Sequence, residues 1–204
     1  MFSILIALIY ISFISLGLPD SLLGSAWPVM RLDFGAEIPL AGAISMTISG
    51  GTIISSLLSD RLTRKLGPGL VNAASVGLTA LALLGFSFSS KVWMLFLWAI
   101  PYGLGAGAVD AALNNFVALH CSSRQMSWLH CFWGVGASIS PYIMSFSLSG
   151  QHGWSGGYFA VSMIQFTLCV ILFATLPIWK KAVPAKATAA SSTAKPIVLK
   201  IFSH

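Results

Sequence analysis

Six long apolar runs follow one another along this chain of 204 residues, and only two acidic residues, Asp20 and Asp110, lie inside them. A run of about 20 apolar residues crosses a bilayer as an α-helix, because a helix satisfies its own backbone hydrogen bonds where water is absent. An ionisable side chain inside such a span costs about 2.5–3.5 kcal/mol on insertion scales, so it is rarely accidental. The sequence therefore predicts an all-α, polytopic membrane protein with a proton- or substrate-handling pair of carboxylates in its interior.

The predicted spans cover most of the chain and leave short connectors between them. They are residues 4–27, 39–58, 70–88, 92–119, 126–150 and 158–179. Residues 1–179 then form one six-helix transmembrane bundle. Residues 180–204 are basic, low in complexity and too polar to pack, so we expect a disordered cytoplasmic linker that is truncated before a second bundle.

The charge content excludes a soluble domain and argues against a nucleic-acid partner. Only 8% of the residues are charged, whereas soluble domains carry about 25%. The net charge is +6, but nine of the eleven Lys and Arg residues fall in alternate connectors and in the C-terminal segment, and Arg31 and Lys91 alone fall in the others. By the positive-inside rule, the basic side is cytoplasmic, and both termini are expected there.

The connector at residues 60–67 carries the most specific motif. With the four residues before it, it resembles the G-x-x-x-D-R-x-G-R-K-x-G loop between helices two and three of the major facilitator superfamily. The matching residues are Asp60, Arg61, Arg64, Lys65 and Gly67. The resemblance implies a conformational latch, in which a carboxylate forms charge-assisted hydrogen bonds with neighbouring guanidinium groups. An ordinary basic loop would explain the cations but not the carboxylate.

Two positions of this loop depart from the family pattern. Ser56 and Thr63 stand where the family has glycines. A side chain at these positions keeps neighbouring helices farther apart, so looser helix packing is expected there.

The two intramembrane acids lie in different settings. Asp20 follows Pro19, which cannot donate a backbone hydrogen bond, so the first helix is expected to bend or open beside the acid. Asp110 lies in a glycine-rich stretch, and Asn114 is one helical turn further on the same face. Two glycines on that face allow a helix or a ligand to approach closely: Gly103 and Gly107.

This pair of acids resembles the fucose-permease-like sugar branch of the same superfamily. Residues 128–141, WLHCFWGVGASISP, also look like the L-H-x-F-[FW]-G-x-G-x-x-x-[GS]-P stretch of that branch. The resemblance implies that Asp20 and Asp110 serve proton coupling and that Asn114 contacts a sugar. The alternative is that both acids are buried, are bonded to polar neighbours and only fix the packing.

Some aromatic residues and one histidine are further candidates. Trp98, Tyr102 and Trp133 lie away from the predicted span ends and are candidate pocket residues, whereas the other tryptophans lie where an aromatic belt is expected. His130, near the cytoplasmic end of its span, is either a titrating group or a packed interfacial histidine.

Enzymatic chemistry is not expected. Residues 153–157 satisfy G-x-S-x-G, but the only histidine after them is His204, outside any span, so Ser155 has no base to activate it. The sequence contains neither a Walker motif nor Cys/His spacing typical of a metal site, so no cofactor or metal is predicted.

The resemblance as a whole implies the N-terminal half of a twelve-helix carrier, built from two inverted three-helix repeats, in a bacterial inner (plasma) membrane. The expected function is proton-coupled sugar transport, with a complementing C-terminal half or a second copy as partner. An efflux carrier, a truncated product that transports nothing and a six-span membrane subunit stay open as alternatives.

Overall fold

The computed structural model describes residues 2–182, and this part of the chain is helical apart from short turns. Its elements are α1 (Phe2–Gly17), α2 (Leu22–Asp33), α3 (Leu40–Leu66), α4 (Pro68–Ser87), α5 (Val92–His120), α6 (Ser123–Ser149), α7 (Gly153–Ala174) and α8 (Leu176–Ala182). The predicted all-α class is confirmed. Residues 180–182, which we had assigned to the linker, belong to α8, and the rest of the predicted linker lies outside the described residues.

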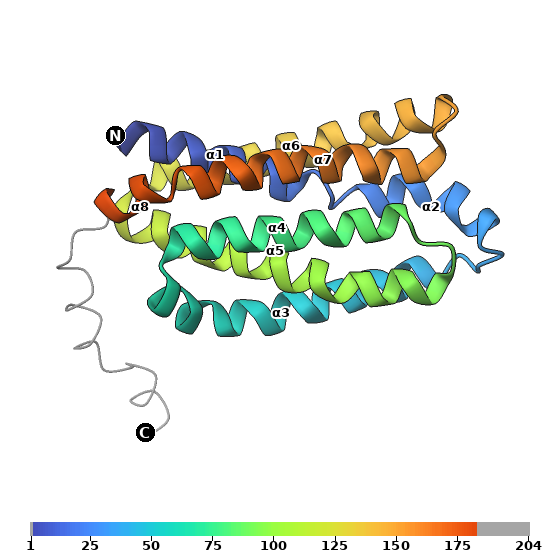
Figure 1. Cartoon of the computed structure of the whole chain (residues 1–204), viewed down its shortest axis with the longest axis horizontal. Helices are drawn as coiled ribbons and strands as arrows, with labels where there is room; N and C mark the ends of the chain where they lie inside the picture. The colour runs from blue at the N-terminus through green and yellow to red at the C-terminus, as the bar shows by residue number, and fades with distance from the viewer. Residues whose placement is uncertain (1, 183–204) are drawn as a thin grey trace, which may run out of the picture.

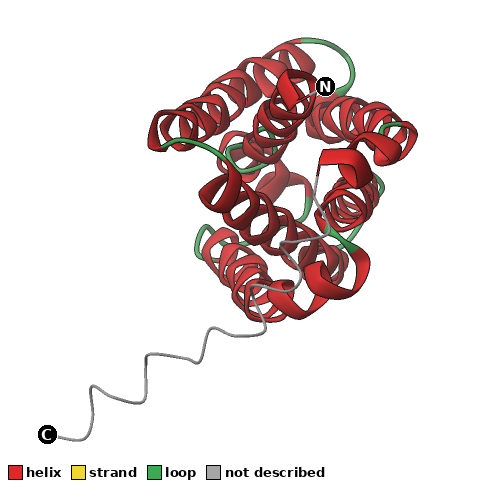
Figure 2. Cartoon of the chain, turned by 90° about the vertical axis from the view of Figure 1, so that its left-hand side faces the viewer, coloured by secondary structure: helices red, strands yellow, loops and turns green. Residues whose placement is uncertain are grey.

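The long helices run alternately in opposite directions within one bundle (Figure 1). The start of α1 and the ends of α3, α5 and α7 lie together at one end, which Figure 2 shows facing the viewer. We call this the basic end, because the cationic residues of the α3 terminus and of the α5–α6 connection lie there. Those within the described side chains are Arg61, Arg64, Lys65 and Arg124.

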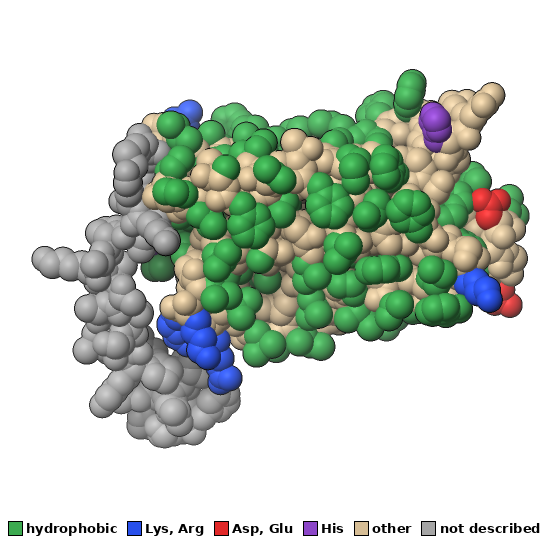
Figure 3. All heavy atoms as spheres, in the orientation of Figure 1, with side chains coloured by type: hydrophobic (Ala, Val, Ile, Leu, Met, Phe, Trp, Pro, Cys, Tyr) green, Lys and Arg blue, Asp and Glu red, His purple; other side chains and the backbone are tan. Residues whose placement is uncertain are grey.

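The surface of the bundle matches a membrane environment. On the face shown in Figure 3, hydrophobic side chains cover the middle, whereas charged side chains gather at the two ends. Lysine and arginine dominate the basic end, and the acidic side chains visible on this face lie at the opposite end. An apolar band between two charged rims is what a lipid-exposed bundle requires.

Five helical segments are long and apolar enough to cross a membrane. The first runs from Ser3 to Asp33 and includes both α1 and α2, and the others are α3, α4, α5 and α7. These segments confirm a multi-pass membrane protein. α6 has the same length as α3, 27 residues, and contains more serine, and it falls outside this set. The fifth predicted span, residues 126–150, therefore stays a prediction.

Several predicted connectors were wrong in extent, because the helices continue into them. Arg31 and Asp33 belong to the last turn of α2, and Arg64 and Lys65 to the last turn of α3. Cations in a last helical turn interact favourably with the carbonyl end of the helix dipole, which agrees with the extension of α3. The connectors expected between the predicted spans at residues 31–37, 60–67, 121–125 and 151–157 are all shortened in this way.

Close backbone contact joins α3 to α5, as the glycine-rich stretch of α5 predicts. A Cβ atom at Gly103 or at Gly107 would collide with backbone carbonyl oxygens of α3. Hydroxyl groups of α3 use this proximity: Thr52 Oγ1 donates to the Gly103 carbonyl at 3.3 Å, and Ser56 Oγ donates to the Gly107 carbonyl at 3.2 Å. The expectation of looser packing at Ser56 was therefore wrong, because its side chain bonds the neighbouring helix instead of separating it.

α1 and α6 form a second close pair. A Cβ atom at Gly17 would collide with the carbonyl of Trp133, and one at Gly136 would collide with the carbonyl of Ile14. Glycine on both helices thus allows the two backbones to touch. This contact fixes Trp133 beside the C-terminal end of α1.

The bundle core contains two large apolar clusters and a small one. One large cluster includes Ile9, Leu113 and Leu172 near the basic end, and the other includes Leu22 and Tyr158 toward the opposite end. Buried polar side chains of α1, α4 and α7 lie among these apolar residues: Ser12, Ser15, Asn72, Ser75, Thr79, Ser162 and Gln165. Polar side chains at this depth require partners inside the protein, since lipid offers none.

The α3–α5 contact yields a direct test. Gly107→Ala should lower the free energy of unfolding by about 1–3 kcal/mol, because the added methyl group overpacks a backbone contact. Gly50→Ala on α3 is the matched control, since nothing lies within 4 Å of the added atom, and it should be neutral or stabilising by up to about 1 kcal/mol. Unfolding of the purified variants in detergent measures both, and equal effects would contradict the assigned contact.

Candidate functional site

The first membrane span is interrupted next to Asp20. The chain leaves the α-helical pattern after Gly17. Asp20 N–H donates to the Gly17 carbonyl at 3.3 Å, and Leu22 N–H donates to the Pro19 carbonyl at 3.1 Å, so both bonds reach back three residues and not the four of an α-helix. Pro19 has no N–H, so the carbonyl of Ser15 lacks the donor that a continuous helix would give it. The opening that Pro19 predicts is thus confirmed.

Gln165 of α7 replaces the missing donor. Its Nε2 donates to the Ser15 carbonyl at 2.8 Å, and its Oε1 accepts a hydrogen bond from Thr79 Oγ1 of α4 at 2.9 Å. The side chain is only 1% exposed, so both ends of its amide are satisfied within the protein. Gln165 therefore ties the interruption of α1 to two other helices. The sequence analysis missed this residue, although an amide within an apolar span is a detectable signal.

Asp20 itself is held by two hydrogen-bond donors from other helices. Tyr102 of α5 donates its hydroxyl proton to Asp20 Oδ1 at 2.8 Å. Trp133 of α6 donates its indole N–H to Asp20 Oδ2 at 2.9 Å. Asp20 and Trp133 are both exposed, the latter by 40%, whereas Tyr102 is buried. Three residues predicted for the site from separate parts of the sequence are thus brought together.

Asp110 lies deeper toward the basic end. It is ten residues before the end of α5, and Asn114 Nδ2 donates to its Oδ1 at 2.9 Å. His130 of α6 is near enough to interact electrostatically with Asp110. The predicted pairing of Asp110 with Asn114 is therefore present.

These groups share one surface of the bundle, which we call the open face. It is defined by three exposed residues, Asp20, His130 and Trp133, with Asp110 and Asn114 half-buried beside them. His130 was left open between a titrating and a packed role. Its ring stands edge-on to Phe13 with 6.1 Å between centroids, while the side chain is exposed. A surface with two carboxylates at membrane depth suits polar solutes and cations, and does not suit lipid.

Comparison with known proteins identifies the family. A sequence profile described as Major Facilitator Superfamily matches residues 9–204. The chain belongs to this superfamily of membrane transporters. It is 28% identical over 148 residues to "Sodium-dependent glucose transporter 1" of Danio rerio, and the matched region covers 71% of this chain and 25% of that protein. It is 24% identical over 176 residues to "Uncharacterized MFS-type transporter YfkL" of Bacillus subtilis (strain 168), covering 84% of this chain and 44% of that protein. The chain thus spans less than half the length of these relatives.

The motif that resembles the superfamily latch forms the end of a helix. Asp60 and Arg64 lie one turn apart on α3 and form an ion pair of 2.9 Å, with both side chains more than half exposed. Arg61 and Lys65 are also exposed on this end of α3. Only Gly67, with a φ of +81°, lies between α3 and α4. The prediction of a connecting loop was therefore wrong for the charged residues, whereas the pairing of acid and guanidinium is present.

Two other sequence candidates lie elsewhere. Trp98 packs its indole ring against Gly85 of α4, where a Cβ atom would collide with it, and makes no hydrogen bond to either carboxylate among the described residues. Ser155 donates its hydroxyl to the backbone carbonyl of His152 at 3.3 Å. The only hydrogen bond that this hydroxyl makes among the described residues is thus to a main-chain oxygen, which cannot act as a general base.

The interruption of α1 can be tested by a double-mutant cycle. Gln165→Leu removes the side-chain donor to the Ser15 carbonyl and should destabilise the protein by about 1–3 kcal/mol. Pro19→Ala restores a backbone N–H that can bond this carbonyl directly, so the same change should cost much less in the Pro19→Ala background. Thermal unfolding of the four proteins gives the coupling energy, with exposed Thr167→Val of α7 as the control. Equal destabilisation in both backgrounds would contradict the assignment.

Proposed function

We propose that this chain is the solute-binding half of a secondary active carrier, which moves a small polar solute, a sugar, together with protons across the plasma membrane. The observation that carries the proposal is the arrangement around Asp20. A carboxylate at an interrupted membrane helix is held by a tyrosine and a tryptophan on an exposed face, and a second acid, Asp110, lies half-buried on the same face.

A sugar fits the chemistry of the open face. Its hydroxyl groups can donate to the carboxylates of Asp20 and Asp110 and exchange hydrogen bonds with the amide of Asn114. The exposed ring of Trp133 offers a flat apolar surface for the C–H face of a pyranose. The Danio rerio relative is named as a glucose transporter, which supports this solute class. The resemblance to the fucose-permease-like branch points the same way.

Coupling to an ion follows from the two acids. In a region of low dielectric constant, the repulsion between neighbouring carboxylates is stronger than in water. A proton bound by Asp110 removes this repulsion, so protonation changes the electrostatics of the solute site directly. The relative's name refers to sodium instead, and a sodium gradient is therefore the competing driving force to be tested.

The proposal includes an organisation in two inverted repeats, α1–α4 and α5–α7. The close pair of α1 and α6 would correspond to the close pair of α5 and α3. The spacing from Gly17 to Asp20 equals that from Gly107 to Asp110, and both glycines contact a carbonyl of the partner helix. In such an arrangement the two acids occupy related positions on opposite sides of the membrane midplane.

The remaining elements of the proposal concern the second half and the latch. We place the basic end in the cytoplasm, with α6 as a sixth span, and a complementing six-helix unit or a second copy over the open face. The ion pair of Asp60 and Arg64 would then hold the basic end in one of the conformations that alternate during transport.

Membrane topology is tested by cysteine labelling. After Cys121, Cys131 and Cys169 are replaced by serine, single cysteines at positions 64 and 91 are treated with an impermeant maleimide. Position 91 should react in intact cells, whereas position 64 should react only after permeabilisation, because the basic end is expected to be cytoplasmic. Reaction of position 64 from outside would overturn this orientation.

Ion coupling is tested in membrane vesicles that contain the chain. Asp110→Asn cannot release a proton, so accumulation of a labelled hexose driven by a pH gradient should fall at least tenfold. Exchange of labelled for unlabelled hexose should persist, because exchange needs no net proton release. Glu37→Gln is the matched control, since it neutralises an exposed acid on the short connection between α2 and α3.

Each outcome of this experiment separates the alternatives. Accumulation by Asp110→Asn equal to that of the parent would make Asp110 a packing residue. Accumulation driven by a sodium gradient alone would replace the proton as the coupled ion. A parent that neither accumulates nor exchanges hexose would contradict the proposed function and favour a membrane subunit.

A further inference from the structure

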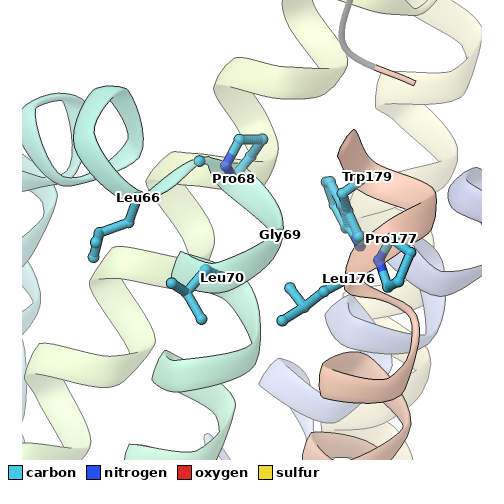
Figure 4. Close-up of a pocket in the computed structure, with 8 residues that line it drawn as sticks. Leu66, Pro68, Gly69, Leu70, Leu176, Pro177 and Trp179 are labelled. Carbon is cyan, nitrogen blue, oxygen red and sulfur yellow. The ribbon is translucent and has the colours of Figure 1, made fainter. Parts of the chain in front are cut away.

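A cavity lies at the basic end of the bundle, away from the open face. It has a volume of about 500 Å³, within the range of small-molecule pockets. It is formed where α3 turns into α4 and where α7 passes into α8, and Figure 4 shows Leu70 on one side with Leu176 and Trp179 on the other. Its lining is almost entirely apolar, including Leu66, Pro68, Leu70, Leu176, Pro177 and Trp179.

The shape of this cavity depends on two tight contacts. Gly69 of α4 lies directly against Trp179, and a Cβ atom there would be less than 3 Å from three atoms of that side chain. Trp179 also packs edge-on against Phe116 of α5, with 5.4 Å between ring centroids, and is 3% exposed. α8 is thus anchored across the end of the bundle by its tryptophan, which leaves the adjacent apolar space between α4 and α8.

Exposed cations lie at the same end of α3 as the cavity. Leu66 lines the cavity, Lys65 directly precedes Leu66, and Arg61 lies one helical turn before Lys65. Among the described residues, Asp60 makes its only ion pair with Arg64, so Arg61 and Lys65 have no carboxylate partner there. An apolar cavity next to cations that lack a partner matches a molecule with a hydrocarbon chain and an anionic head.

We propose that this cavity, which we call the α4–α8 cavity, binds an anionic phospholipid of the leaflet at the basic end. One acyl chain lies between Leu70 and Leu176, and the phosphate lies near Arg61 and Lys65. Cations at a membrane surface attract anionic lipids by about 1 kcal/mol each, which adds to the burial of the acyl chain. The site is separate from the open face and does not depend on the transported solute.

Binding is measured on the purified full-length chain with phosphatidylglycerol and phosphatidylcholine of the same acyl chains as probes. Phosphatidylglycerol should be retained in native mass spectrometry and should raise the thermal unfolding midpoint by roughly 3–8 °C, since it binds the folded state. Phosphatidylcholine should do neither to a comparable extent. Equal retention of the two lipids would overturn the proposal, because the cations would then play no part.

Two kinds of variant assign the binding to the α4–α8 cavity. Removing both cations, by Arg61→Gln with Lys65→Gln, should weaken phosphatidylglycerol binding about 25-fold, or about fivefold for each cation. Lys91→Gln at the opposite end is the charge control and should bind as the parent does. Leu70→Trp fills the cavity and should abolish retention, whereas Leu81→Trp, at an exposed position further along α4, should not.

The remaining outcomes decide against the proposal. Unchanged phosphatidylglycerol binding by the Arg61/Lys65 double variant and by Leu70→Trp would place the lipid elsewhere. A further outcome would be that lipid has no effect on the parent, while trypsin cleaves the Leu70→Trp variant faster at Lys186. That outcome would show that the chain's own C-terminal segment occupies the cavity. None of these readouts requires transport, so they are independent of the proposed function.

Discussion

The site depends on one missing backbone hydrogen bond. Pro19 removes the donor for the Ser15 carbonyl within a membrane span, where water cannot replace it. Gln165 supplies that donor from α7, and Thr79 fixes the other end of the amide from α4. The interruption beside Asp20 is thus compatible with the bilayer only because the two neighbouring helices provide its partners. The interruption beside Asp20 is therefore supported by α4 and α7, neither of which carries a predicted site residue.

Glycine contacts determine which side chains surround the acids. The α1–α6 contact at Gly17 and Gly136 brings Trp133 to Asp20. The α3–α5 contact at Gly103 and Gly107 fixes the helix that carries Asp110 against α3. Because side chains cannot be inserted between touching backbones, these contacts restrict sliding and rotation of the paired helices. Movement of the bundle is therefore expected between the pairs rather than within them.

The helical class and every span except that at residues 126–150 could be predicted from the sequence, because they follow from hydropathy. The pairing of Asp110 with Asn114 could be predicted from helical spacing. The sequence also brought Asp20, Tyr102 and Trp133 forward as candidates, but one at a time. Their meeting depends on helix pairing, which a single sequence does not encode locally. Gln165 was missed for the same reason, since its partner is a main-chain carbonyl 150 residues away. The charged motif was misplaced in a loop because its family pattern gives spacing, not secondary structure.

The exposure of the acids constrains how this bundle can sit in a membrane. A carboxylate at membrane depth is costly against lipid, and Asp20 is exposed even though two donors bond it. Exposed apolar residues on α3 and α7, such as Ile53 and Val170, carry no such cost in contact with lipid. The lowest free energy is therefore reached when lipid contacts the apolar surfaces and protein or water covers the open face. This is the physical reason for assigning a second six-helix unit to that face, because a polar cavity between two such units keeps both acids away from lipid.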